Sequence, residues 1–264
     1  KNILDSLDPK LLGQRIQDSR KARGMTQQDV ASELGMARTT VTALEKGERR
    51  IQTQEIIELA KLYGREVSDL VSGRKILGDF AVQFRASVIK AGTYQTELEQ
   101  AILEFQKLCE DYIYLEGLSD TPLQRAYPSE YSVGGLQPEE AAEDIASAER
   151  NRLGLGDAPI TNLRELLEND VGLRVFYLRL PSRIAGMFTY SDELGGCIAI
   201  NSAHPEERRR WSLAHEYGHF LTSRFRPEVS ILLAYERTPA SERLGDGFAS
   251  AFLMPTSGMR RKFN

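Results

Sequence analysis

The stretch AHEYGHF at residues 214–220 limits the local structure more than any other part of this sequence. His215 and His219 are four residues apart, and Glu216 directly follows the first of them. Positions i and i+4 of an α-helix lie on one face, so two imidazoles at this spacing can hold one Zn²⁺. Glu216 can take a proton from a water molecule at such a metal. Two of the chain's three histidines fall in this motif, which favours a zinc site over a chance pattern.

A zinc site needs at least one further protein ligand. The third histidine, His204, lies at the start of the same predicted helix, too far along its axis to join the pair. A carboxylate is therefore expected downstream, where residues 241–255 read SERLGDGFASAFLMP. Glu242 and Asp246 in this stretch are four residues apart and share a helix face. The residues alone leave the choice between them open.

Residues 9–73 read as a compact set of short helices, in which apolar residues recur at helical spacing and glycines mark the turns. Thr26 followed by Asp29 is a helix-start signal. Gly35 permits a tight turn before a second helix that runs from about Ala37 to Glu45. A short helix after a tight turn is the geometry of a recognition helix in the major groove of DNA. We therefore predict an all-α helix-turn-helix domain over 9–73.

The second of these helices has a polar outer face, because its apolar residues Val41 and Leu44 point inward. An arginine on that face can read guanine bidentately, and threonines can contact a phosphate or a thymine methyl group. A glutamine at the positive N-terminal end of the preceding helix is placed to bind a phosphate. The predicted contacts to double-stranded DNA are Gln27, Arg38, Thr39, Thr40 and Thr42.

The charge distribution agrees with a DNA-binding N-terminal part, the head, at residues 1–75. Residues 1–75 contain 14 Lys and Arg against 11 Asp and Glu, whereas the rest of the chain contains 20 against 27. A basic head on an acidic body fits contact with phosphate. No apolar run reaches the roughly 18 residues that a membrane span requires, so no membrane contact is expected. Two cysteines without CxxC spacing favour a reducing, cytoplasmic location.

Residues 76–137 are expected to form a helical linker. Apolar residues from Leu98 to Leu115 recur at helical spacing and predict one long amphipathic helix over 94–116. This helix either packs on its own chain or provides the contact of a homodimer. Glycines and prolines between residues 117 and 138 predict an irregular segment after it.

Residues 138–264 are predicted to form an α+β domain. A helix begins at Pro138, and a second helix covers NLRELLEND at 162–170. The stretch LRVFYLRL at 173–180 reads as a strand, and AGMFTYSDELGGCIAIN at 185–201 reads as a β-hairpin. The helix with the two histidines follows. The C-terminal stretch FLMPTSGMRRKFN indicates the start of a further helical segment.

The N-terminal part resembles the repressor-type helix-turn-helix family with five helices, the XRE or lambda/434-repressor-like family. Such proteins usually bind DNA as dimers on paired half-sites. Ala37 departs from the capping serine that this family often has at that position. The residues that carry the resemblance are Arg15, Ile16, Arg20, Gly24, Thr26, Gln27, Val30, Ala31, Leu34, Gly35, Val41, Leu44, Glu45 and Gly47.

The sequences INSAHPEERRRWSLAHEYGHFL and ERLGDGFASAFLMP resemble the ImmA/IrrE family of zinc metallopeptidases, and this likeness covers about residues 139–258. The resemblance implies a zincin-like fold in which His215, His219 and Glu242 hold Zn²⁺ and Glu216 is the catalytic base. Asp246 is the alternative third ligand. The hairpin around CIAIN resembles the edge strand of zincins, along which a substrate peptide could add as an extra strand.

The sequence thus predicts a multidomain protein with an all-α helix-turn-helix domain, a helical linker and an α+β zincin-like metallopeptidase domain. Members of the ImmA/IrrE family cleave repressor-type proteins, which suggests a zinc-dependent metalloendopeptidase that cuts a separate repressor. A second interpretation is a DNA-binding regulator that senses a signal through a domain with little or no peptidase activity. A third is a scaffold with a structural zinc. Glu216 and a three-ligand site favour catalysis, because structural zinc normally has four protein ligands.

Overall fold

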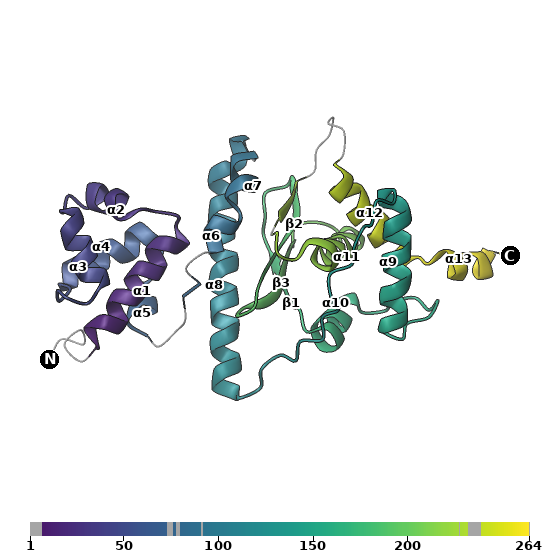
Figure 1. Ribbon diagram of the computed structural model, residues 1–264, viewed down its shortest axis with the longest axis horizontal. Coiled ribbons are helices and arrows are strands. Elements are labelled where there is room, and N and C mark those ends of the chain that lie inside the picture. Colours follow the sequence, from purple (N-terminus) through teal and green to yellow (C-terminus); the bar gives the residue numbers. More distant parts are fainter. Residues whose placement is uncertain are drawn as a thin grey trace. The chain divides into compact units, whose positions relative to one another are not determined.

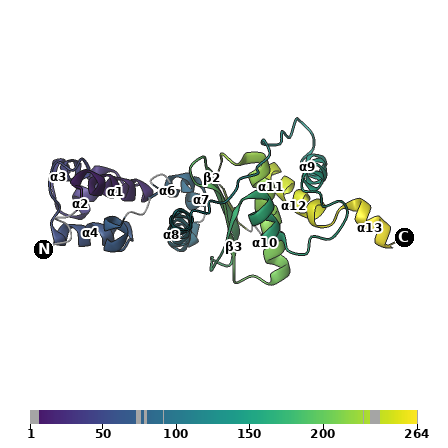
Figure 2. The same ribbon diagram turned by 90° about the horizontal axis from the view of Figure 1, so that it is seen from below.

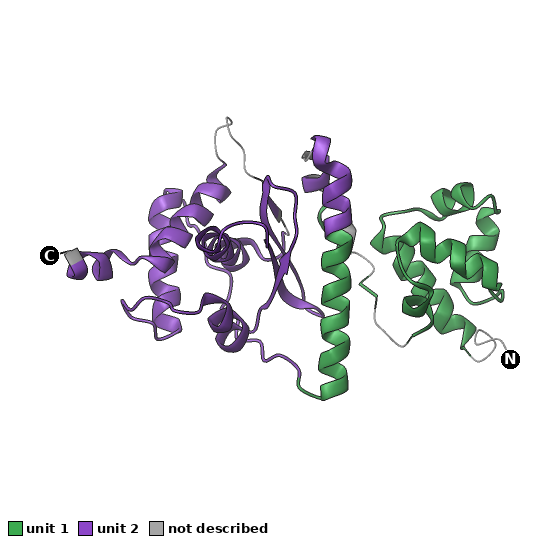
Figure 3. Ribbon diagram, turned by 180° about the vertical axis from the view of Figure 1, so that it is seen from behind, with its two compact units in different colours: residues 1–85, 102–121 green, residues 86–101, 122–264 purple. Residues whose placement is uncertain are grey.

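The computed structural model describes residues 7–72, 76–77, 80–90, 92–226, 228–231 and 239–263. The chain divides into two compact units, residues 1–85 with 102–121 and residues 86–101 with 122–264 (Figure 3). The first unit is helical and the second combines helices with a sheet, so the predicted multidomain fold class is confirmed. Residues 73 and 264, which end two of the predicted domains, lie outside the described residues.

The first unit begins with five short helices (Figure 1): α1 Pro9–Ala22, α2 Gln27–Glu33, α3 Arg38–Glu45, α4 Thr53–Tyr63 and α5 Val67–Val71. Asp8 caps α1 through the Lys10 amide, and the predicted capping box of Thr26 and Asp29 starts α2. Ala37 is the N-cap of α3 and makes no side-chain cap bond there. The local signals of the sequence therefore place these helices as expected.

Close contact between α1 and α3 depends on Gly13. A Cβ on this residue would lie 2.5 Å from the Leu44 carbonyl oxygen and 2.6 Å from that of Glu45. Only glycine lets the two helix backbones approach this closely, and this packing closes the core of the helical bundle. The buried side chains of this core include Ile16, Val30, Val41, Ile56, Leu59, Tyr63 and Leu70.

Four helical segments follow: α6 Phe80–Gln83, α7 Arg85–Lys90, the 3₁₀ turn η2 Gly92–Tyr94 and the long helix α8 Gln95–Ser119. The predicted helix over 94–116 is thus present. Glu110 of α8 is buried, pairs with Arg65 at 2.7 Å and accepts from the Leu77 amide at 2.8 Å. These bonds explain why residues 102–121 belong to the first unit, although the sequence suggested one linker over 76–137.

The second unit contains a four-stranded mixed sheet in the order β1-β3-β2-β4. Strand β1 Arg174–Leu178 runs parallel to β3 Gly195–Asn201, whereas β2 Ile184–Ser191 is antiparallel to β3 and to β4 Glu228–Ile231. The helices are α9 Pro138–Arg152, α10 Leu163–Leu166, α11 Glu206–Ser223, α12 Ala240–Leu253 and α13 Thr256–Phe263, with a π-helical turn η3 Leu167–Val171. Figure 2 shows α11 lying along the sheet, with α12 beside it.

Neither strand of the hairpin around CIAIN is an edge of this sheet, so that prediction was wrong. CIAIN lies within β3, which is paired on one side with β1 and on the other with β2, and the other strand of the hairpin, β2, is also paired with β4. All seven residues of β3 are buried, as expected for a strand with neighbours on both sides. The edges of the described sheet are β1 and β4.

The second unit begins before Pro138, because residues in the preceding segment make hydrogen bonds to its strands and turns. The Tyr127 hydroxyl donates to the Gly172 carbonyl at 2.8 Å and accepts from the Gly196 amide at 3.0 Å. Arg125 donates to the carbonyls of Asp192 and Glu193 at the hairpin turn. The predicted irregular segment is therefore an integral part of the α+β unit. Among the described residues, no helix is both long and apolar enough to cross a membrane.

Candidate metal centre and nucleic-acid interface

Helix α11 carries the HExxH residues at its buried centre. Glu206 and Glu207 lie in its first turn, where negative charge is favourable, and the helix continues to Ser223. His215 and His219 are 6% and 1% exposed, and Glu216 is fully buried. Burial removes competing water, so these side chains are held in one arrangement against the sheet and α12.

Helix α12 brings Glu242 to the histidine pair. The Nε2 atoms of His215 and His219 are 2.9 Å apart, and the Glu242 carboxylate oxygens lie 3.4 Å and 3.5 Å from them. Tetrahedral zinc with ligands at about 2.0–2.1 Å has donor atoms roughly 3.3 Å apart. Two imidazoles and one carboxylate at these separations therefore fit a zinc site with one position left for water or substrate.

Gly245 leaves space for this cluster. A Cβ on Gly245 would lie 2.8 Å from His215 Cε1 and 3.0 Å from His219 Nε2. A glycine inside a helix costs about 1 kcal/mol relative to alanine. Here it keeps the helix backbone of α12 against both imidazole rings, which is the approach that Glu242 needs.

Asp246 lies on the other side of His215. Its Oδ1 atom is 2.9 Å from His215 Nδ1, the ring nitrogen that points away from Glu242, and its side chain is 56% exposed. This is the position of a carboxylate that fixes the orientation of a ligating histidine rather than that of a third ligand. The two carboxylates that the sequence left as alternatives thus lie at different nitrogens of the His215 ring.

The two histidines differ in pKa. Burial lowers the pKa of His219 to about 4, and the charge of His215 acts in the same direction. Burial would also lower the pKa of His215, but hydrogen bonds to Asp246 and Glu242 and the charges of Glu216 and Glu242 raise it to about 10. The carboxylates around His215 therefore favour a positive charge at this cluster.

Glu216 points from α11 towards β2, where Gly186 makes room for it. A Cβ on Gly186 would lie 2.7 Å from Glu216 Oε1 and 2.9 Å from Ile200 Cδ1. Beside it, the Phe188 ring is parallel to the His219 imidazole with centroids 6.2 Å apart. Strand β2 thus forms the wall of the site opposite α12. The spacing of residues along the chain gave no indication of either residue, because their positions depend on sheet topology.

Three further residues of this region lie outside the cluster. His204 was predicted to start the helix, but it lies before α11, where its Nε2 atom is 3.2 Å from the Ser182 carbonyl oxygen. Tyr217 is fully buried and donates its hydroxyl to Glu149, so it points away from the histidine pair. Gly218 makes room for the Phe248 ring, which a Cβ at this position would meet at 2.9 Å.

The predicted DNA-contacting residues gather on α2 and α3. Arg38 and Thr39 are exposed, whereas Thr40, Thr42 and Gln27 are half-buried. Thr42 donates to the Gln27 side-chain oxygen at 3.0 Å. The side chains therefore form one patch, with Arg38 and Thr39 free to reach outward and Gln27 held in position by Thr42.

A buried ion pair between Glu45 and Arg20 lies next to this patch. Glu45 has a fully buried side chain and pairs with Arg20 of α1 at 2.6 Å. The Gln27 amide donates to the same carboxylate at 2.8 Å. Glu45 thus connects α1, α2 and α3 and fixes Gln27, a contact that no spacing in the sequence indicated.

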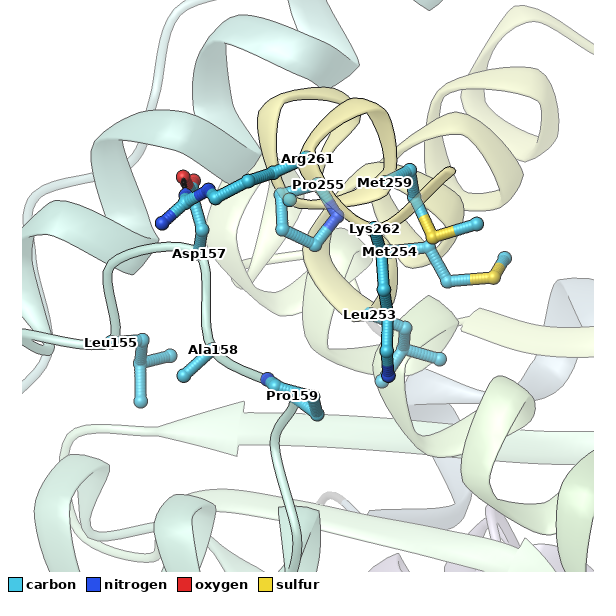
Figure 4. A pocket seen from close by; sticks show the side chains of 11 residues that line it. Leu155, Asp157, Ala158, Pro159, Leu253, Met254, Pro255, Met259, Arg261 and Lys262 are labelled. Carbon is cyan, nitrogen blue, oxygen red and sulfur yellow. Dashed lines mark hydrogen bonds and ion pairs between the residues drawn. The ribbon is translucent and has the colours of Figure 1, made fainter. Parts of the chain in front are cut away.

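A separate pocket of about 630 Å³ lies between residues 155–159 and α13 (Figure 4). It is mainly apolar, with Met254, Met259 and Pro159 on its walls and Lys262 at its side. Arg261 pairs with Asp157 at its rim. None of the residues of the metal cluster line it, so it is not a candidate for the peptidase site.

Comparisons with known proteins agree with this division of the chain. Residues 16–70 match the model of the helix-turn-helix family, and residues 168–264 match that of the IrrE N-terminal-like domain. Over 62 residues the chain is 34% identical to the cryptic phage CTXphi transcriptional repressor RstR of Vibrio cholerae. That stretch is 24% of this chain and about half, 56%, of the repressor. The chain thus combines a helix-turn-helix of the XRE type with an ImmA/IrrE-like domain, as its sequence suggested.

Proposed function

We propose that this chain is a DNA-binding zinc metalloendopeptidase that cleaves a repressor-type protein and thereby controls transcription. One observation carries the proposal: His215, His219 and Glu242 converge at zinc-ligand separations directly beside the buried Glu216. The match to the IrrE N-terminal-like domain supports a peptidase, and the matches of the head to the helix-turn-helix family and to a repressor support DNA binding in the cytoplasm.

Each residue of the site has a distinct part in this mechanism. His215, His219 and Glu242 would hold Zn²⁺, which when bound supplies a Lewis acid for the peptide carbonyl. Asp246 accepts a hydrogen bond from His215 Nδ1 and fixes the orientation of that ring. Glu216 takes a proton from the attacking water and delivers it to the leaving amine.

The test is a comparison of wild type with Glu216→Gln. Both proteins are loaded with zinc and incubated with extract from the source cells, and new protein N-termini are identified by terminal-amine labelling. The proposal expects cleavage of a helix-turn-helix protein by the wild type only, with equal zinc content in both. If the wild type binds zinc but generates no new N-termini, the proposed peptidase activity is contradicted.

A regulator without significant proteolysis is the second candidate, and the 34% identity of the head to a phage repressor favours it. In that case the head binds an operator and the IrrE-like domain responds to a signal. One experiment separates the two candidates: regulation of a reporter gene by the Glu216→Gln variant. If this variant binds the operator and regulates the gene as the wild type does, the regulator without proteolysis is supported.

We also propose that the chain acts as a homodimer through α8. Leu115 and Leu118 are 60% and 66% exposed and lie three residues apart on this helix. Apolar residues at this spacing form one stripe that a second copy could cover. Sedimentation of the wild type beside a variant with both leucines replaced by Glu tests this, since only the wild type is expected to dimerise.

A further inference from the structure

Strand β2 is the strand of the sheet that faces the metal cluster. Gly186 adjoins Glu216, and Phe188 lies against His219. Residues two apart in a strand point to the same side of a sheet, so this face of β2 is directed at α11. An extended peptide that paired with the outer edge of β2 would therefore pass beside the catalytic base.

The outer edge of β2 is covered by the chain's own strand β4. The register pairs Gly186 with Ser230, Met187 with Val229 and Phe188 with the first residue of β4. Opposite residues of an antiparallel pair share a face, so Ser230 lies on the side of Glu216. Along the chain, β4 lies between α11, which carries the histidines, and α12, which carries Glu242.

The pairing of β4 with β2 is weaker than that of β3 with β2. Strand β3 pairs with β2 in unbroken register from Gly186 to Ser191, whereas the β4 ladder is interrupted by a register shift between Ile184 and Gly186. Ser230 is 5% exposed, and its hydroxyl has no hydrogen-bond partner in the part of the chain that the structure describes. A buried hydroxyl left unpaired destabilises the strand that carries it. Val229, 5% exposed, is the apolar anchor that opposes this.

We propose that β4 is a built-in inhibitory strand: it occupies the edge of β2 at which an extended segment of the substrate protein binds, and it must leave before that segment can pair. The inference rests on the proposed peptidase function and identifies the substrate as an extended, strand-forming segment. Main-chain hydrogen bonds to β2 give this segment its affinity, and the pleat places every second side chain beside α11.

Two substitutions in β4 should act in opposite directions. Val229→Asp places a charge at the buried anchor and releases β4, whereas Ser230→Ala removes the unpaired hydroxyl and holds β4 more firmly. Both are made in the Glu216→Gln background, so that no cleavage disturbs the measurement. The probe is a fluorescein-labelled peptide with the β4 sequence EVSI between two glycines at each end, and its binding is followed by fluorescence anisotropy. Deuterium exchange of residues 184–190 reports whether the edge of β2 is open.

The proposal expects Val229→Asp to bind the peptide at least tenfold more tightly than the Glu216→Gln parent, with faster exchange along β2. It expects Ser230→Ala to bind severalfold more weakly and to exchange more slowly. Equal binding by all three proteins, or no binding by a Val229→Asp protein whose β2 amides exchange fast, would overturn it. If Val229→Asp does not fold, the proposal is still overturned when Ser230→Ala binds the peptide as tightly as the Glu216→Gln parent or more tightly.

The peptidase function is tested separately by restoring Glu216 in the Val229→Asp protein. Loaded with zinc, this variant should degrade fluorescein-labelled casein faster than wild type. Peptide binding without any cleavage would contradict the peptidase function while leaving the strand exchange established.

Discussion

An alanine at position 245 is expected to weaken zinc binding without unfolding the domain. The added Cβ would lie 2.8 Å from His215 Cε1 and 3.0 Å from His219 Nε2. Carbon atoms prefer separations of about 3.5–4.0 Å, so the rings must move by roughly 0.5–1 Å. Disturbing the groups that orient a ligand typically lowers metal affinity by about 10- to 100-fold. This corresponds to about 1.4–2.8 kcal/mol of binding free energy.

Gly247→Ala is the matched control, because it lies on the same helix and also meets a close contact. Its Cβ would lie 2.9 Å from the Ala142 Cβ of α9, away from the metal cluster. Both variants gain about 1 kcal/mol of helix propensity, so only their neighbours differ. Zinc affinity is measured by competition with a chromophoric chelator, and folding by circular dichroism. Wild-type zinc affinity in a folded Gly245→Ala protein would show that zinc binding does not depend on the space that Gly245 leaves for the two imidazole rings.

Four other substitutions test the remaining assignments. Glu242→Ala should weaken zinc binding more than Asp246→Ala, which should lose only about 10- to 100-fold as an outer partner of His215; the reverse order in the same chelator assay would exchange their roles. Glu45→Ala should destabilise the helix-turn-helix head by about 3–5 kcal/mol, since it leaves a buried guanidinium unpaired, and a change below 1 kcal/mol in chemical denaturation would contradict this. Arg38→Ala should weaken operator binding by about 1–3 kcal/mol in gel-shift titrations, and unchanged site preference would remove Arg38 from the readout.

The sequence predicted the parts of the structure that depend on local spacing. The HExxH pair lies on one face of α11, and the capping box at Thr26 starts α2, because both signals act within one helical turn. The resemblance to a peptidase family also indicated Glu242, which the structure brings to within 3.5 Å of both histidines. The first two features need no knowledge of distant contacts, and the third was indicated by the family resemblance alone.

The features that the sequence did not predict depend on which segments become neighbours. Spacing cannot show that Gly186 faces Glu216, because the order β1-β3-β2-β4 places a strand from one part of the chain beside a helix from another. For the same reason the hairpin around CIAIN was predicted to provide an edge strand. Glu242 and Asp246 share one face of their helix, so the sequence alone does not separate them. The structure does, because Glu242 lies near Nε2 of His215 and Asp246 lies near Nδ1 of the same ring.

The proposed metal site is best tested by zinc content per chain, measured by elemental mass spectrometry on wild type beside His219→Ala. We expect about one zinc in the wild type, since His215, His219 and Glu242 already lie at ligand separations, and none in the variant, which retains only two of these groups. No zinc in the wild type after purification without chelators and after zinc is added back would contradict this expectation. The IrrE-like domain would then contribute something other than metal-dependent hydrolysis.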